Sequence, residues 1–206
     1  TPKISVTQDL GPREGQSLEA LEKLRPIFDR KFGTVTAGNA CPVTDGAAAL
    51  LVCLEKDVDS FDLPEKPVGF LRAHAYAGCP PDKMGLGPVF AAVKLLKHAG
   101  IGMKSIGLFE INEAFACQVM SCLKLFASPL LREKFGVNGD DVLSELDPSK
   151  LNVNGGAIAL GHPVGTSGTR LILTILKEMS RRGVQTGLAS LCIGGGQGAA
   201  LLLERE

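Results

Sequence analysis

Apolar residues recur at every third or fourth position in several stretches of the chain, which is the spacing of one face of an amphipathic helix. The spacing predicts helices over residues 17–32, 88–100 and 166–182, and one that begins after Asn112. Two of these boundaries carry the expected residue types, because Pro88 opens one helix and Gly183 follows the arginines that end another. Pro26 interrupts the first helix.

Short apolar runs bounded by turn residues predict the strands. These runs cover residues 47–55, 68–76, 106–110, 187–193 and 198–204, and the end of a strand falls at 151–154. The run at 47–55 reads as a buried strand, with a helix as the alternative. Because strands alternate with helices along the chain, the sequence favours a layered α/β fold.

The charges are balanced, with 22 lysines and arginines against 22 aspartates and glutamates in 206 residues. A neutral balance gives no support for nucleic acid or an anionic membrane as the main partner. No apolar run reaches the roughly 18–20 residues that a membrane-spanning helix requires. We therefore predict neither a nucleic-acid partner nor a transmembrane segment.

The six cysteines form no CxxC pair, and their spacing suits neither a zinc site nor a small disulfide framework. We expect reduced cysteines in an intracellular protein, and no bound metal. The chain opens at Thr1 without a methionine or a signal-like apolar stretch. It is therefore expected to begin inside a longer protein, which is cytoplasmic unless a targeting segment directs it to an organelle.

Glycine is clustered at residues 155–168 and 194–198, where the backbone adopts unusual conformations or is approached closely by another group. His162 lies in the first cluster between Gly161 and Pro163, directly before a helix. The start of a helix favours negative charge, such as a thiolate or an oxyanion. We therefore interpret His162 as functional rather than as an ordinary packed histidine.

Cys192 and Asn112 each allow a structural and a functional reading. Cys192 ends an apolar strand before three glycines, whose free N–H groups lower a thiol pKa and can form an oxyanion hole. Its alternative is a buried cysteine before a hairpin turn. Asn112 stands between a strand and a helix, where it either caps the helix or donates to a developing negative charge.

Three sequence motifs resemble those of the thiolase family, the enzymes that join or cleave 3-ketoacyl-CoA. They are NEAF at 112–115, GHP at 161–163 within NVNGGAIALGHPVGTSG, and CIGGG at 192–196. The segments TAGNA at 36–40, DGAAA at 45–49 and MGLGP at 84–88 add to the resemblance, which extends over essentially the whole chain. A fourth family motif, which holds the nucleophilic cysteine, is not recognised around any of the six cysteines.

The resemblance implies an architecture. It predicts a layered α-β-α fold with a mixed five-stranded sheet flanked by helices. Residues 1–33 correspond to the tail of the family's loop domain, 34–66 to the end of its N-terminal domain, and 67–206 to its C-terminal domain. The charged, proline-containing segment 56–66 agrees with a boundary at that point.

The resemblance also implies roles for the four candidate catalytic residues. His162 resembles the base that activates the nucleophilic cysteine and helps to hold the thioester oxygen. Asn112 resembles the residue that fixes the water of the same oxyanion hole. Cys192 resembles the acid/base that moves the proton at C2 of acetyl-CoA, and the N–H of Gly194 resembles a donor of the second oxyanion hole.

Substrate contacts follow from the same resemblance. Met84 and Phe115 match positions that line the substrate and pantetheine pocket, and Cys41 stands where many thiolases have a serine that bonds the pantetheine. Coenzyme A is then a substrate, no redox cofactor or metal is required, and a homodimer or tetramer is expected. Because the nucleophile is expected in a missing N-terminal half, this chain alone is predicted to be inactive.

Four readings of the activity remain open at this point. The length of residues 124–150 favours a degradative thiolase of fatty-acid β-oxidation over a biosynthetic acetoacetyl-CoA thiolase. A decarboxylating ketosynthase fits poorly, because such enzymes use two histidines with their cysteine and Cys192 occupies the second position. A non-catalytic acyl-CoA-binding relative is the fourth reading, and the intact motifs argue against it.

Overall fold

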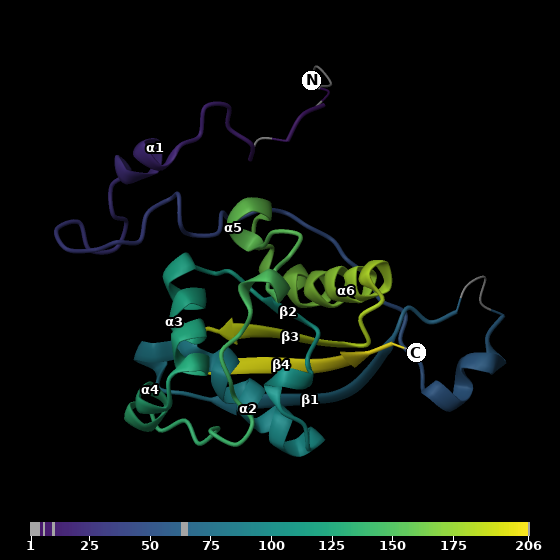
Figure 1. Cartoon of the computed structure of the whole chain (residues 1–206). Helices are drawn as coiled ribbons and strands as arrows, with labels where there is room; N and C mark the ends of the chain where they lie inside the picture. Colours follow the sequence, from purple (N-terminus) through teal and green to yellow (C-terminus); the bar gives the residue numbers. More distant parts are fainter. Residues whose placement is uncertain (1–4, 6, 10, 63–65, 206) are drawn as a thin grey trace.

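The computed structural model describes residues 5, 7–9, 11–62 and 66–205. Its strands are β1 (Phe70–Gly78), β2 (Leu108–Ile111), β3 (Thr186–Ile193) and β4 (Gln197–Glu204). They form one sheet in the spatial order β1-β4-β3-β2, shown in Figure 1. β4 runs antiparallel to both of its neighbours, whereas β2 and β3 are parallel. The sheet is therefore mixed, as predicted.

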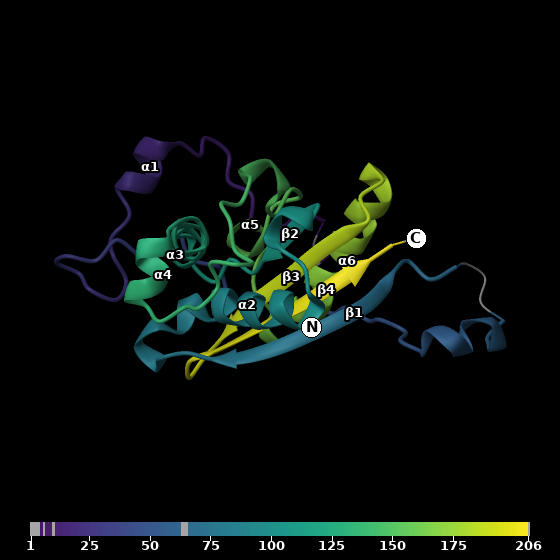
Figure 2. The same cartoon turned by 60° about the horizontal axis from the view of Figure 1, so that its bottom comes forward.

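One long helix covers each face of the sheet. α2 (Gly87–Ala99) packs against β1, β4 and β3, and α6 (Val164–Arg182) packs against β3 and β2 on the other side (Figures 1 and 2). Successive strand residues point to opposite faces, so Leu188 joins the core under α2 while Ala189 joins the core under α6. The predicted layered α-β-α arrangement is confirmed.

Shorter elements complete the described part of the chain. α3 (Ala116–Ala127) lies against α2 and extends the core on that side of the sheet. The remaining helices and 3₁₀ turns are α1 (Leu18–Glu22), η1 (Glu55–Ser60), η2 (Pro81–Leu86), η3 (Met103–Ser105), α4 (Pro129–Lys134), η4 (Pro148–Lys150) and α5 (Ala157–Leu160).

The predicted helix over 17–32 is wrong beyond its first turn. α1 begins after Ser17, whose side-chain oxygen accepts a hydrogen bond from the Ala20 N–H at 3.2 Å, but the helix ends at Glu22. Pro26 has no N–H to donate and its ring excludes a preceding helical turn. The next residue, Ile27, instead donates its N–H to the carbonyl of Val35 at 2.9 Å.

The predicted buried strand at 47–55 is also wrong, and so is the helical alternative. The segment is neither helix nor strand before η1 begins at Glu55. Leu51 is 82% exposed and Val52 is 77% exposed. A strand needs a neighbouring strand for its backbone N–H and C=O groups. No described residue forms a ladder or bridge with this segment.

The expected fifth strand is reduced to one bridge, so the described residues form a four-stranded sheet. Leu151 makes an isolated parallel bridge with Phe109 of β2, beyond which no ladder forms. The backbone of Asn152 has a φ of 44°, and the Gly155 N–H donates to the Asn152 carbonyl at 2.8 Å. This turn ends the extended segment predicted at 151–154.

Candidate active site

The candidate residues meet where the parallel strands β2 and β3 end. Asn112 directly follows β2, and Cys192 lies near the end of β3. The Asn112 N–H donates to the carbonyl of Ser190 at 2.9 Å, which ties the end of β2 to the strand that bears Cys192. His162 reaches the same region from the loop between α5 and α6. The fold thus gathers the three motifs that are far apart in the sequence.

Asn112 faces His162 and does not cap the following helix. Its Nδ2 lies 3.3 Å from Nε2 of His162, and the residue is only 1% exposed. α3 begins at Ala116 with Phe115 as the N-cap, and no side chain caps it. The capping interpretation of Asn112 is therefore wrong, and its amide is available to the site.

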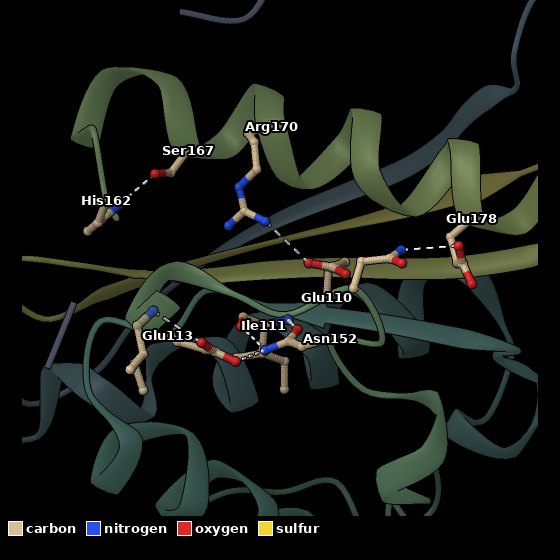
Figure 3. Close-up of polar contacts among 10 residues, drawn as sticks. Glu110, Ile111, Glu113, Asn152, His162, Ser167, Arg170 and Glu178 are labelled. Carbon is tan, nitrogen blue, oxygen red and sulfur yellow. Dashed lines mark hydrogen bonds and ion pairs between the residues drawn. The ribbon is translucent and has the colours of Figure 1, made fainter. Parts of the chain in front are cut away.

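His162 is held by its backbone and by the far side of its ring. Its backbone N–H donates to the carbonyl of Pro42 at 3.0 Å. The ring atom Nδ1 lies 2.6 Å from the hydroxyl oxygen of Ser167, in the first turn of α6 (Figure 3). The Ser167 hydroxyl in turn lies 3.3 Å from the Pro163 carbonyl.

One protonation pattern satisfies all of these contacts. If the Ser167 hydroxyl donates to Pro163, it accepts from Nδ1–H of His162, and the lone pair of Nε2 then accepts from the Asn112 amide. Burial lowers the pKa of His162, and the positive charge of Arg170 lowers that pKa further. The imidazole is therefore neutral at pH 7, with its basic nitrogen toward the site.

Cys192 carries a proton under the same conditions. The residue is 9% exposed, and this burial raises the pKa of its thiol above the ordinary value. The backbone N–H of Cys192 does lower this pKa, but burial outweighs that effect, so the net shift is upward and not downward as the sequence suggested. Cys192 is thus a thiol that can donate a proton rather than a thiolate.

Gly194, two residues after Cys192, has open space beside it. A Cβ added at Gly194 would meet no atom of the described residues within 4 Å. Gly195 and Gly196 have φ values of 87° and 94°, which non-glycine residues rarely adopt, and they turn the chain from β3 into β4. The turn is fixed on one side by the Cys79 N–H, which donates to the Gly196 carbonyl at 2.8 Å.

The structure brings two predicted substrate-binding residues close to Asn112. The Cys41 N–H donates to the Ala114 carbonyl at 3.1 Å, and Phe115 pairs with Ala40 in an isolated bridge. Burial raises the pKa of the Cys41 thiol, so it too is protonated. Met84 lies in η2, and its carbonyl is 4.0 Å from the sulfur of Cys79 beside the glycine turn.

Sequence reasoning missed the polar residues that hold these motifs in place. Asn152 accepts from the Ile111 N–H at 2.8 Å and donates to the Ile111 carbonyl at 2.9 Å and to the Glu113 carboxylate at 2.8 Å (Figure 3). Glu113 also accepts from the Ile158 N–H at 3.2 Å. These contacts clamp the NVNGG segment to the end of β2. Asn152 was visible only as the first residue of that polar segment.

Within residues 11–62 and 66–205 and the few described before them, no group of three or more His, Cys, Asp or Glu side chains is placed to hold a metal ion. No helix in the described part of the chain is long and apolar enough to cross a membrane.

The fold and the site define a class of protein. It is a layered α/β protein in which a neutral histidine, a buried amide and a protonated thiol gather at the ends of two parallel strands. A base, an amide donor and an acid in one place are the groups that acyl transfer with proton transfer at carbon requires.

Two family profiles match the chain: "Thiolase, C-terminal domain" over residues 65–205 and "Thiolase, N-terminal domain" over residues 1–56. A Chromobacterium violaceum protein named acetyl-CoA acetyltransferase is 47% identical over 189 residues, or 92% of this chain and 43% of that protein. Human mitochondrial 3-ketoacyl-CoA thiolase in complex with CoA matches with a TM-score of 0.81 and 40% identity, covering 98% and 46% of the two chains. The dimeric peroxisomal thiolase of Saccharomyces cerevisiae gives 0.79 and 39%, with the same coverage.

This chain belongs to the thiolase family. It spans less than half the length of the relatives that it matches. The N-terminal profile ends at residue 56 and the C-terminal profile begins at residue 65. The finer division at residues 33 and 66 stays a prediction.

Proposed function

We propose that this chain carries the acid/base and oxyanion-binding part of a thiolase active site. The full-length protein would cleave a 3-ketoacyl-CoA with coenzyme A to acetyl-CoA and a shortened acyl-CoA, or run the reverse condensation. The observation that carries the proposal is the chain of contacts from Asn112 through His162 to Ser167, which holds a neutral imidazole nitrogen against Asn112 at the end of β2. Cys192 lies near the end of the adjoining strand β3. The site is completed by a nucleophilic cysteine outside residues 1–206.

In the first half of the reaction, Nε2 of His162 takes the proton of that cysteine. The thiolate attacks C3 of the 3-ketoacyl-CoA, the C2–C3 bond breaks, and the acyl group becomes a thioester on the cysteine. The electron pair of the broken bond remains on the leaving fragment as the enolate of acetyl-CoA. Cys192 protonates C2 of this enolate, which releases acetyl-CoA and leaves Cys192 as a thiolate.

In the second half, the Cys192 thiolate takes the proton of the coenzyme A thiol. The coenzyme A sulfur attacks the thioester, the shortened acyl-CoA leaves, and the nucleophilic cysteine departs as a thiolate. His162 then returns its proton to that thiolate, so both residues end as they began. Each proton moved in the first half is thus restored in the second, and the sequence of steps needs neither a redox cofactor nor a metal.

The negative charges that develop in these steps fall on two oxygens. Nε2 of His162 and a water fixed by Asn112 hold the thioester oxygen, and the N–H of Gly194 donates to the enolate oxygen of acetyl-CoA. The open space at Gly194 supports this assignment, because a Cβ there would meet no described atom. Cys41 and Phe115 lie beside Asn112 and, with Met84, are assigned to the pantetheine and substrate pocket.

Coenzyme A is the proposed substrate partner and a homodimer the proposed assembly, with a tetramer as the alternative. The human relative was solved with CoA, and the yeast relative is dimeric. All six cysteines are free, which agrees with an intracellular, reducing compartment, and the cytoplasm is our expectation.

Two thiolase activities compete for this site. The Chromobacterium relative is named an acetyl-CoA acetyltransferase, whereas the human relative is named a 3-ketoacyl-CoA thiolase. The length of residues 124–150, which include α4 and the loop after it, favours the degradative activity on longer acyl chains. Comparing kcat/KM for acetoacetyl-CoA and for 3-ketoacyl-CoA substrates of increasing chain length separates the two.

Replacing His162 by Ala in the full-length protein tests the proposal. We expect kcat/KM for thiolysis to fall by about 10²- to 10⁴-fold, the usual contribution of a general acid/base. Consumption of the 3-ketoacyl-CoA substrate measures the rate. His98→Ala is the matched control, because His98 is exposed near the end of α2 and should leave the rate unchanged. Equal rates in the two variants would contradict the role of His162.

A further inference from the structure

A buried ion pair lies beneath the candidate site and takes no part in the proposed steps. Glu110 of β2 and Arg170 of α6 face each other with 3.7 Å between Oε2 and Nη1. The Glu110 side chain is 3% exposed and that of Arg170 is 22% exposed. Figure 3 shows the guanidinium of Arg170 projecting from the helix toward the carboxyl group of Glu110.

The pair is poorly satisfied, which argues against a purely stabilising role. Oε2 of Glu110 and both Nη atoms of Arg170 have no hydrogen-bond partner among the described residues. Removing charges from water without full hydrogen bonding can cost more than a loose ion pair returns. Burial raises the pKa of Glu110 to about 7, against the opposing effect of Arg170 and with help from Glu113 and Glu178.

The two partners stand on the elements that carry the contact between Asn112 and His162. Glu110 lies two residues before Asn112 on the same strand end, and Arg170 lies one helical turn after Ser167, which holds His162. The ion pair therefore closes a ring of contacts. The ring runs from Asn112 to His162, along α6 to Arg170, and across to Glu110.

We infer that Glu110 and Arg170 are positioning residues that dock α6 on β2 and thereby set the separation of Asn112 and His162. The inference rests on the proposed function for its effect on rate, but its geometric part stands without it. Neither residue touches the reacting atoms; both act through His162. Movement of a catalytic group by about 1 Å can cost about 10²-fold in rate, which is why such a contact matters.

Arg170 has a second effect on the same histidine, through its charge. It is the positive group that lowers the pKa of His162 beyond the effect of burial. The other charged groups that face this pair are carboxylates: Glu113, and Glu178, which is already bonded by Arg181 at 2.8 Å. A neutral base is the form that can accept a proton, so removing the positive charge should raise the pH at which His162 becomes active.

The test uses Arg170→Met and Arg170→Lys in the full-length protein. For Arg170→Met we expect kcat/KM to fall by about tenfold to a hundredfold, and the acidic limb of its pH profile to move to higher pH. Arg170→Lys keeps the charge and loses the guanidinium geometry, so the rate should fall while the limb stays in place. Lys97→Met with Asp141→Asn removes an exposed ion pair of 3.3 Å and is the control, with no change expected.

Crystal structures of the wild type and both variants supply a readout that does not depend on turnover. We expect the distance of 3.3 Å between Asn112 Nδ2 and His162 Nε2 to lengthen in each variant. An unchanged distance overturns the inference, and so does an Arg170→Met profile with an unmoved acidic limb. If the wild type cleaves no 3-ketoacyl-CoA, the proposed function fails, while the distance still decides the positioning role. If Arg170→Met does not fold, Arg170→Lys decides it through rate and distance.

Discussion

The chemistry of His162 depends on groups that are individually unremarkable. An amide, a hydroxyl and a guanidinium surround its ring, and each affects a different property. Ser167 fixes which nitrogen carries the proton, Asn112 meets the other nitrogen, and Arg170 lowers the pKa of the ring. Burial strengthens all three effects, because interactions between charges and dipoles are larger where water is excluded.

Replacing Ser167 by Ala removes the group that holds Nδ1 of His162. Hydrogen bonds that orient metal-binding histidines typically contribute about tenfold to a hundredfold, and by analogy we expect kcat/KM of the full-length protein to fall by that factor. The stability should fall by about 1 kcal/mol, the usual net value of one hydrogen bond. Ser121→Ala is the control, because Ser121 is exposed and its hydroxyl bonds only to the Cys117 carbonyl of its own helix. A wild-type kcat/KM in Ser167→Ala would show that the hydroxyl does not orient the ring.

The sequence revealed only those site residues whose chemistry is marked by their immediate neighbours. His162, Cys192 and Asn112 were found because glycine, proline or a strand end stands beside them. Their supporting residues were given no role, although three of them lie inside the recognised motifs, because most of their partners lie far away in the chain and their contacts appear only in the fold. These supporting residues are Glu110, Glu113, Asn152, Ser167 and Arg170.

At the scale of elements, the clamp between the NVNGG segment and the end of β2 controls how the site is assembled. Gly156 has a φ of −145°, which any residue can adopt, so its backbone does not require glycine. A Cβ at this position would instead collide with the carboxylate of Glu113. That carboxylate is the acceptor for Asn152 and for Ile158, and it cannot move without breaking both bonds.

Gly156→Ala should therefore destabilise this chain by about 1–3 kcal/mol, as overpacking usually does. Gly165→Ala is the matched control, because Gly165 lies inside α6 and a Cβ there meets no described atom within 4 Å. Alanine is favoured over glycine in a helix, so the control should be neutral or slightly stabilising. Thermal unfolding of the two variants provides the comparison, and equal midpoints would argue against the collision.

Elements with a local signal were predicted well, and those that depend on a distant partner were not. α2, α6, β3 and β4 lie close to their expected bounds because periodicity, proline and glycine mark them within the sequence. The run at 47–55 has the composition of a strand, but composition cannot supply the neighbour that a strand requires. The single bridge at Leu151, in place of a fifth strand, has the same cause.

At the scale of the whole molecule, the segment at 43–54 exposes several large apolar side chains. Val43, Leu51, Val52 and Leu54 are 99%, 82%, 77% and 62% exposed, and all four belong to one segment without helix or strand. An apolar stretch of this kind on a protein surface favours association. The chain also spans less than half the length of its relatives, so parts of the family fold lie outside it.

We therefore expect this chain, studied by itself, to self-associate through the segment at 43–54. Replacing Leu51 and Val52 by Ser removes much of its exposed apolar surface, at no cost in core packing, because neither side chain is buried. Size-exclusion chromatography with light scattering should then give a smaller mass than for the unmodified chain. Leu18→Ser with Leu130→Ser is the matched control: both residues are 74% exposed but lie outside the segment at 43–54, so association should persist. If the control variant dissociates as readily, association depends on total apolar exposure rather than on this segment.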